Sequence, residues 1–124
     1  MAKTVLDAVL DAALNYVKTN GTRLCVCSTQ PTTYTEAITT YKLAIKTIAS
    51  GDYTGPADDT SGRKVTVNQQ AAITVDTGGT ANFVAIADSG ASALLFVTTC
   101  TAQVLTSGNT VTVPAWKINI QDPT

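Results

Sequence analysis

Three cysteines are the first side chains in this sequence that could be reactive or bind a metal. Cys25 and Cys27 alternate along a short predicted strand, so both thiols point to one face, and Cys100 could lie near them. A zinc site would need a fourth ligand, and one intervening residue differs from the two to four residues of structural zinc sites. The sequence has no histidine, which is the commonest general base and transition-metal ligand. We therefore predict buried, unreactive thiols and no metal site.

Three aspartates form the second candidate cluster. Asp52, Asp58 and Asp59 share a predicted loop over residues 49–62 with Ser and Thr hydroxyls, and such oxygen ligands can bind calcium. Their spacing matches neither an EF-hand nor a nonapeptide calcium repeat, so turn-forming aspartates are the favoured interpretation. Gly78-Gly79 lacks the strand, loop and helix that surround a phosphate-binding loop. The sequence thus predicts a protein that is not an enzyme and has no catalytic residues and no cofactor.

Aromatic side chains offer contacts with a partner instead. Trp116 is the only tryptophan, and it follows Pro114 near the start of the last predicted strand. A core anchor is the default role for such a residue. An interface anchor is the alternative, because lone aromatics are enriched at binding hot spots. The candidate interface residues are Trp116, Tyr53, Phe83 and Phe96.

Composition limits the partners that the chain can bind. The formal net charge is −1, only 14% of residues are charged, and no block of Lys or Arg is present. Nucleic acid is therefore not an expected partner, because binding it needs a basic patch. No apolar run approaches the roughly 20 residues that span a bilayer. The start of the chain is unlike a signal peptide, so we expect no membrane partner and a protein that is kept in a cytoplasm.

The chain is predicted to form a single domain over residues 1–124, with four regions in order. Apolar residues recur on one helical face over about residues 4–20, in a helix that either closes the core or docks on a partner. A mixed segment over 23–48 combines a short strand, one or two turns of helix and a second strand. The loop over 49–62 follows. Residues 63–121 form short strands separated by Gly, Ser, Asn and Asp turns, a pattern typical of sandwiches and barrels.

The central hairpin of this β region, residues 81–100, is apolar on both faces. Phe83 and Ala85 lie on one face of the first strand, and Val84 and Ile86 lie on the other. A two-layer fold buries one face of each sheet, so we expect the second face to lie under the N-terminal helix or against another chain. The predicted fold class is mainly β (α+β). It is an antiparallel β-sandwich or barrel-like domain with an N-terminal amphipathic helix packed on it.

A set of turn and strand motifs covers most of the chain. The motifs are Cys27-Ser-Thr-Gln-Pro-Thr-Thr-Tyr-Thr-Glu-Ala37, Tyr53-Thr-Gly-Pro-Ala-Asp58 with Ser61-Gly-Arg-Lys-Val65, Leu95-Phe-Val-Thr-Thr-Cys100, Gly108-Asn-Thr-Val-Thr-Val-Pro-Ala-Trp116 and Asp122-Pro-Thr124. In these motifs the chain resembles small virion structural proteins of tailed bacteriophages, of the capsid decoration (cement) type. The resemblance implies a non-enzymatic subunit, present in many copies, that binds the head surface and stabilises the capsid.

The resemblance also implies partners and a location. The expected partner is the major capsid protein or another virion structural protein, with self-association as a dimer or trimer. The expected location is the virion, assembled in the host cytoplasm. Two alternatives stay open at this point. One is a tail or head–tail connector subunit, and the other is a receptor- or carbohydrate-binding β module, which normally displays clustered exposed aromatics.

Overall fold

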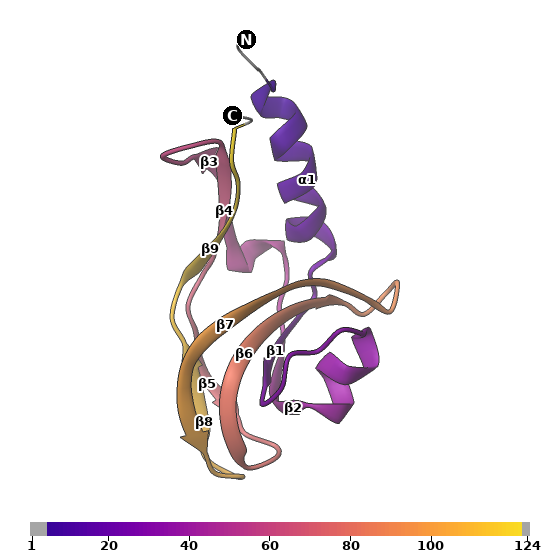
Figure 1. The fold of residues 1–124 in the computed structure, drawn as a ribbon, viewed down its shortest axis with the longest axis vertical. Coiled ribbons are helices and arrows are strands. Elements are labelled where there is room, and N and C mark those ends of the chain that lie inside the picture. The colour runs from indigo at the N-terminus through magenta and orange to yellow at the C-terminus, as the bar shows by residue number, and fades with distance from the viewer. Residues whose placement is uncertain (1–4, 123–124) are drawn as a thin grey trace.

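Antiparallel sheets and one N-terminal helix make up the protein, as the sequence predicts (Figure 1). The structure is a computed structural model that describes residues 5–122. The molecule is elongated, with a barrel-like end and a narrower end where the helix lies beside a small sheet. The predicted mainly β class, with sheets packed together in a sandwich-like arrangement, is therefore confirmed.

The barrel-like end is built from two sheets. The larger one has four strands in the order β2 (Lys42–Thr47), β1 (Arg23–Cys27), β6 (Gly79–Asp88) and β7 (Ala93–Leu105). The smaller one pairs β5 (Gln70–Thr74) with β8 (Thr110–Val113). A bridge between Ala44 and Val75 joins the edge of β2 to the segment that follows β5. The strands therefore follow one another from β7 round to β8, and no ladder connects those two strands.

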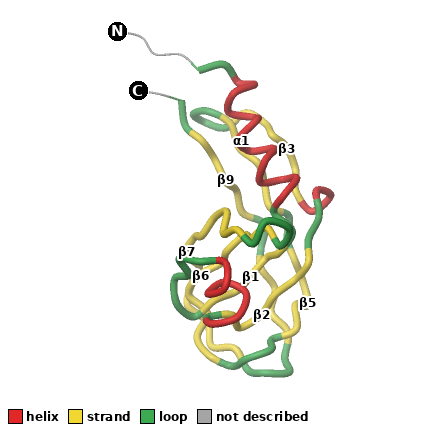
Figure 2. The backbone as a smooth tube through the Cα atoms, turned by 90° about the vertical axis from the view of Figure 1, so that its right-hand side faces the viewer, coloured by secondary structure: helices red, strands yellow, loops and turns green. Residues whose placement is uncertain are grey.

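The narrower end combines a helix with a three-stranded sheet. The sheet has the order β3 (Tyr53–Asp58), β4 (Arg63–Val67) and β9 (Trp116–Ile120). Figure 2 shows α1 (Asp7–Asn20) running alongside these strands, and its buried residues are Leu10 and Leu14. The predicted start of the helix near residue 4 lies outside the described residues, and the helix begins at Asp7. Among the residues described, no helix is long and apolar enough to cross a bilayer.

The second face of the main sheet is covered by a short helical turn and not by α1. This turn, η1 (Glu36–Thr40), is π-helical and places Ala37 over β1 and β6. Cys25, Cys27 and Ala85 lie beneath it and have no exposed surface. The small Ala37 side chain lets the turn approach the sheet closely. Cover by the N-terminal helix or by another chain was expected for this face. The first alternative is wrong, because α1 packs on the three-stranded sheet of the narrower end.

The predicted loop over residues 49–62 is also corrected by the structure. It contains a short 3-10 helix, η2 (Ser50–Asp52), and then strand β3. Gly55 and Pro56 suggest a turn in the sequence, but here they form a bulge, because the register of β3 against β4 shifts between Thr54 and Ala57. Proline is tolerated at such a position since β3 is the end strand of its sheet.

Candidate binding groove

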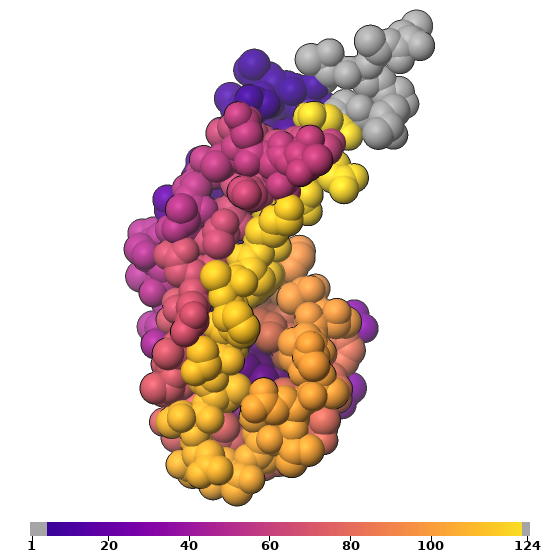
Figure 3. Space-filling view, turned by 90° about the vertical axis from the view of Figure 1, so that its left-hand side faces the viewer, coloured from indigo at the N-terminus to yellow at the C-terminus, as the bar shows by residue number. Residues whose placement is uncertain are grey.

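A groove opens where the barrel-like wall has no strand ladder, between β7 and the strands β8 and β9. It consists of two adjoining cavities of about 250 Å³ and about 220 Å³. Figure 3 shows the surface hollowed between the orange segment of β7 and the yellow segment of β8 and β9. All three strands are end strands of their sheets. Their outer edges therefore offer backbone N–H and C=O groups for pairing.

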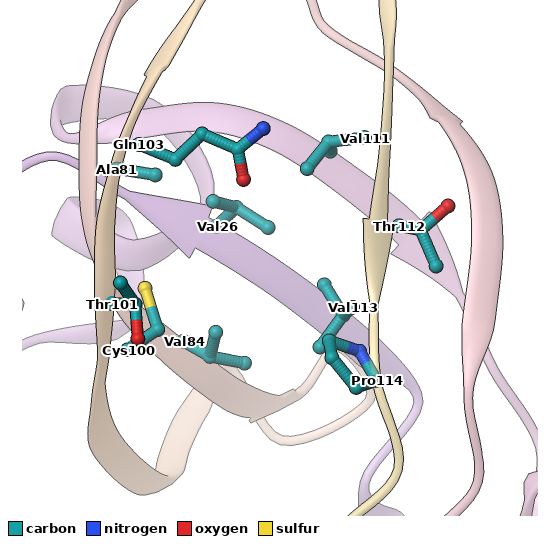
Figure 4. A pocket seen from close by; sticks show the side chains of 10 residues that line it. All are labelled: Val26, Ala81, Val84, Cys100, Thr101, Gln103, Val111, Thr112, Val113 and Pro114. Carbon is teal, nitrogen blue, oxygen red and sulfur yellow. The ribbon is translucent and has the colours of Figure 1, made fainter.

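The floor of the groove is apolar, and its walls carry uncharged polar groups except at the smaller cavity, where Lys117 of β9 is a lining residue. Val26 of β1 and Val84 of β6 lie at the floor between the two walls (Figure 4). The Gln103 side chain of β7 extends from one wall into the space between the strands. The remaining lining residues of the larger cavity are Ala81, Cys100, Thr101, Val111, Thr112, Val113 and Pro114. The groove thus presents an apolar base with hydroxyl and amide groups along its rims, and one charged lining residue, Lys117, whose Nζ pairs with Asp59.

Two aromatic rings connect the walls at one end of the groove. Phe96 of β7 stacks on Trp116 of β9, with ring centroids 5.7 Å apart and an interplanar angle of 26°. Trp116 also lines the smaller cavity. Its indole Nε1 is buried and has no hydrogen-bond partner among the described residues. A buried donor without a partner lowers the stability of the fold by about 1–3 kcal/mol. An acceptor placed beside the indole N–H would therefore be favourable.

The structure brings two of the four candidate interface residues to the groove and places the other two elsewhere. Trp116 lines the smaller cavity, and Phe96 stacks on its ring. Tyr53 is only 4% exposed, and its hydroxyl donates a hydrogen bond to the Gly21 carbonyl at 2.8 Å, so it anchors the core. Burial raises its pKa above the ordinary value. Phe83 packs with the cluster beneath η1, on the opposite face of the main sheet.

The cysteines occupy two environments. Burial raises the pKa of Cys25 to about 12 and the pKa of Cys27 to about 11. The Cys27 thiol lies 3.6 Å from the Ala37 carbonyl oxygen, to which it donates. Cys100 lines the groove and is half-buried, and burial raises its pKa as well. All three thiols are therefore protonated near neutral pH and weakly nucleophilic.

The three loop aspartates do not converge on one point. Each carboxylate has a separate partner: the backbone N–H of Ala49 donates to Asp52 at 2.9 Å, Arg63 to Asp58 at 2.6 Å and Lys117 to Asp59 at 2.7 Å. These contacts hold turns and strands together. Across the part of the chain that the structure describes, no group of three or more His, Cys, Asp or Glu side chains is arranged to hold a metal ion.

A long uncharged stretch forms the groove walls, and sequence reasoning missed it. From Ser89 to Trp116 the sequence contains no Asp, Glu, Lys or Arg. This stretch includes all of β7 and β8, and residues 101–104 of β7 are exposed. In the sequence, this stretch is the long interval between the charged residues Asp88 and Lys117. The average composition of the whole chain conceals it. The strand order then brings this uncharged stretch to both sides of one opening.

Comparison with known proteins leaves the groove to be interpreted from its own chemistry. No protein-family model, curated protein or solved structure matches the chain. The groove is characterised by its open strand edges, its apolar floor and rims on which Lys117 is the one charged lining residue.

Proposed function

We propose that the protein is a non-enzymatic structural subunit of a bacteriophage virion, of the capsid decoration (cement) type. The observation that carries the proposal is the uncharged groove face from Ser89 to Trp116, with its open strand edges and apolar floor. Such a face loses little solvation when another protein covers it, and depletion of charge is typical of interface centres. The sequence motifs that resemble virion structural proteins support the same role.

The groove is suited to an extended segment of a neighbouring shell protein. The free edge of β7 and the free edges of β8 and β9 can pair with an added strand through backbone hydrogen bonds. Small apolar side chains of that strand would rest on Val26 and Val84. A carbonyl of the added strand would also give the Trp116 indole N–H an acceptor after a small side-chain adjustment. The partner in this proposal is the major capsid protein or another virion structural protein.

Many weak contacts of this kind stabilise a shell collectively. A ligand that binds the assembled lattice, and not the dissociated subunits, favours the lattice by its binding free energy. Repetition over the shell makes detachment slow even when each contact is weak. Self-association of the subunit as a dimer or trimer strengthens this effect, because linked sites bind with avidity.

Copy number and particle stability test the proposal. Particles stripped of the protein should burst at a lower temperature, and adding the protein back should restore the original value. The copy number per particle, measured by mass or by quantitative gel, should be on the order of hundreds, as expected for a lattice. About six or twelve copies would place the protein in a ring at the neck or tail and would contradict the decoration role.

A matched pair of variants tests the groove itself. Thr101 and Ala102 are adjacent and exposed on β7, but only Thr101 lines the groove. Thr101→Arg should abolish binding to stripped particles because it places an unpaired charge in the contact. Ala102→Arg adds the same charge to the outer face and should bind as the wild type does. Equal binding by both variants would show that the groove is not the contact.

A further inference from the structure

β7 and β8 follow one another in the chain, but no ladder joins them among the described residues. Only residues 106–109 connect the two strands, a connection short enough for a β-hairpin. β7 forms its ladder with β6 instead, and β8 forms its ladder with β5. The two connected strands therefore face each other across the groove, and each has a free edge there.

The strands on the two sides of the opening run in opposite directions. Each neighbouring pair from β7 through β6 and β1 to β2 is antiparallel. The bridge from β2 to the residue after β5 is also antiparallel, and so is the pair of β5 with β8. Because direction alternates from strand to strand, β8 runs antiparallel to β7. An ordinary antiparallel ladder between them therefore closes the barrel without any change of strand order or direction.

Burial along β7 and β8 gives the register of such a ladder. Leu105 and Val111 are both buried, so both side chains point to the interior. Thr112 points away from the groove in Figure 4, and Val104 is 76% exposed, so these two lie on the outer face. Antiparallel partners advance in opposite directions, so a ladder that pairs Leu105 with Val111 also places Val104 beside Thr112. This register keeps apolar side chains inside and covers part of Val104.

Little holds the β5–β8 pair along its sides. A bridge between Ala44 and Val75, and no continuous ladder among the described strands, joins the pair to β2. Toward the narrower end both of its strands are interrupted at one level, since residues 68–69 lie opposite residues 114–115. Ala72 in β5 also has a φ of 56°, in the left-handed region that is strained for a residue with a Cβ. The pair can therefore shift as a unit, and strained residues of this kind are typical of segments that switch.

We propose that β8 moves against β7 and closes the groove, so that the subunit alternates between an open and a closed barrel. Closure pairs two strand edges that the open barrel leaves to water. It buries no charge, because the stretch from Ser89 to Trp116 has none. The connection over 106–109 and the stack of Phe96 on Trp116 already join the two sides at the ends of the opening.

This inference rests on the proposed function, because it describes how the groove of that function is regulated. An added strand from a neighbouring protein pairs with the free edges of β7 and β8, and closure uses the same edges. The partner therefore binds the open barrel, and the closed fraction lowers its apparent affinity.

A disulfide across the opening tests closure in the full-length chain, with Cys100→Ser removing the half-buried native thiol. In that background, Val104→Cys with Thr112→Cys should form an intramolecular disulfide under mild oxidation, because closure brings the two thiols together. Both native side chains are exposed, so the substitutions leave the core unchanged. Val104→Cys with Thr80→Cys is the positive control, since these residues are already partners in the β6–β7 ladder.

Spin labels at Val104 and Thr112 give a second measurement that does not depend on the exact register. The closed barrel should add a population in which the labels are closer than in the open barrel, by roughly the strand spacing of about 5 Å. Labels at Val104 and Thr80 should show one population. A single open distance for the first pair, together with no disulfide, would overturn the inference.

The disulfide-locked chain separates this inference from the proposed function. Oxidised Val104→Cys with Thr112→Cys should lose binding to stripped particles, and reduction of the disulfide should restore it. A locked chain that binds as well as its reduced form would overturn the regulation by closure. Failure of the proposed function looks different: the wild type would not bind particles, while the disulfide and the shorter label distance would still form in the isolated chain and support closure.

Discussion

The two ends of the molecule differ in how far ion pairs hold them together. At the α1 end, Arg63 binds both Asp11 and Asp58, and Lys117 binds Asp59. At the barrel-like end, the stretch from Ser89 to Trp116 has no charged side chain, and apolar packing on both faces of the main sheet holds the strands. A single helix on a three-stranded sheet encloses little core, so ion pairs help to set its orientation there. The barrel-like end has one ion pair among the described residues, Lys42 with Asp76 at 3.1 Å, and it lies away from the uncharged stretch that forms the groove walls.

The two ends meet at a tight junction beneath the end of α1. The Gly21 carbonyl accepts a hydrogen bond from the Tyr53 hydroxyl, and the Gly21 N–H donates to Val17 at 2.7 Å. Ile86 of the main sheet lies close to the same glycine. The contacts of Gly21 therefore join α1 to the barrel-like end. Substitutions at Gly21 and on either side of it test how each end is held together.

The largest effect is expected from emptying the core beneath α1. Leu14 is 1% exposed, so Leu14→Ala should lower the free energy of unfolding by about 2–5 kcal/mol. Val9→Ala on the exposed side of the same helix should change it by less than about 0.5 kcal/mol. Denaturant unfolding at a concentration where the chain is monomeric measures both values. Equal losses of unfolding free energy in the two variants would show that both sides of α1 are packed.

A smaller loss is expected at the junction. A Cβ added at Gly21 would lie 2.6 Å from the Val17 carbonyl oxygen and 2.7 Å from Ile86 Cγ2, and it would also meet the Tyr53 hydroxyl. Gly21→Ala should therefore cost about 1–3 kcal/mol through overpacking. Gly51→Ala is the matched control, because an added Cβ there meets no atom within 4 Å. Thermal unfolding that is unchanged in Gly21→Ala would show that the junction is loose.

The thiols beneath η1 test how well the second face of the main sheet is closed. Cys25→Ser should cost about 1–3 kcal/mol, because it buries a hydroxyl in an apolar site. Cys100→Ser should cost less, since Cys100 is half-buried beside the groove. In the native chain, a thiol reagent at pH 8 should modify Cys100 well before Cys25 or Cys27. Rapid modification of all three would contradict the cover provided by η1.

The smallest effect is expected from acid at the α1 end. The hydrogen bond from Lys117 holds the pKa of Asp59 below its ordinary value of 3.8. A pKa that is lower in the folded state contributes stability above the unfolded value, and this contribution is lost as pH falls through the folded value. Stability measured between pH 5 and pH 2 should therefore fall less in Asp59→Asn than in the wild type. In a Lys117→Met background, Asp59→Asn should change the acid sensitivity of stability much less than it does in the wild-type background. The same change in both backgrounds would show that another partner lowers the pKa of Asp59.

Local patterns in the sequence determined the elements of this protein. Apolar residues at helical spacing predicted α1, and alternation with regular turns predicted the strands of the β region. The turn of helix and the second strand predicted within the mixed segment over 23–48 correspond to η1 and β2. The extra strand β3 was missed because Gly55-Pro56 resembles a turn, and only its ladder with β4 makes it a strand.

The tertiary structure alone decided what each face meets. The apolar stripe of α1 is wider than the sheet beneath it, and docking buries Leu10 and Leu14 while leaving Val9 exposed. Phe96 and Trp116 are separated by twenty positions, and their stack across the groove follows from strand order. Periodicity depends on neighbours in the chain, so the sequence reveals it. The face that becomes covered is decided by pairing between segments that are distant in the chain. Such pairing produces no local pattern in the sequence.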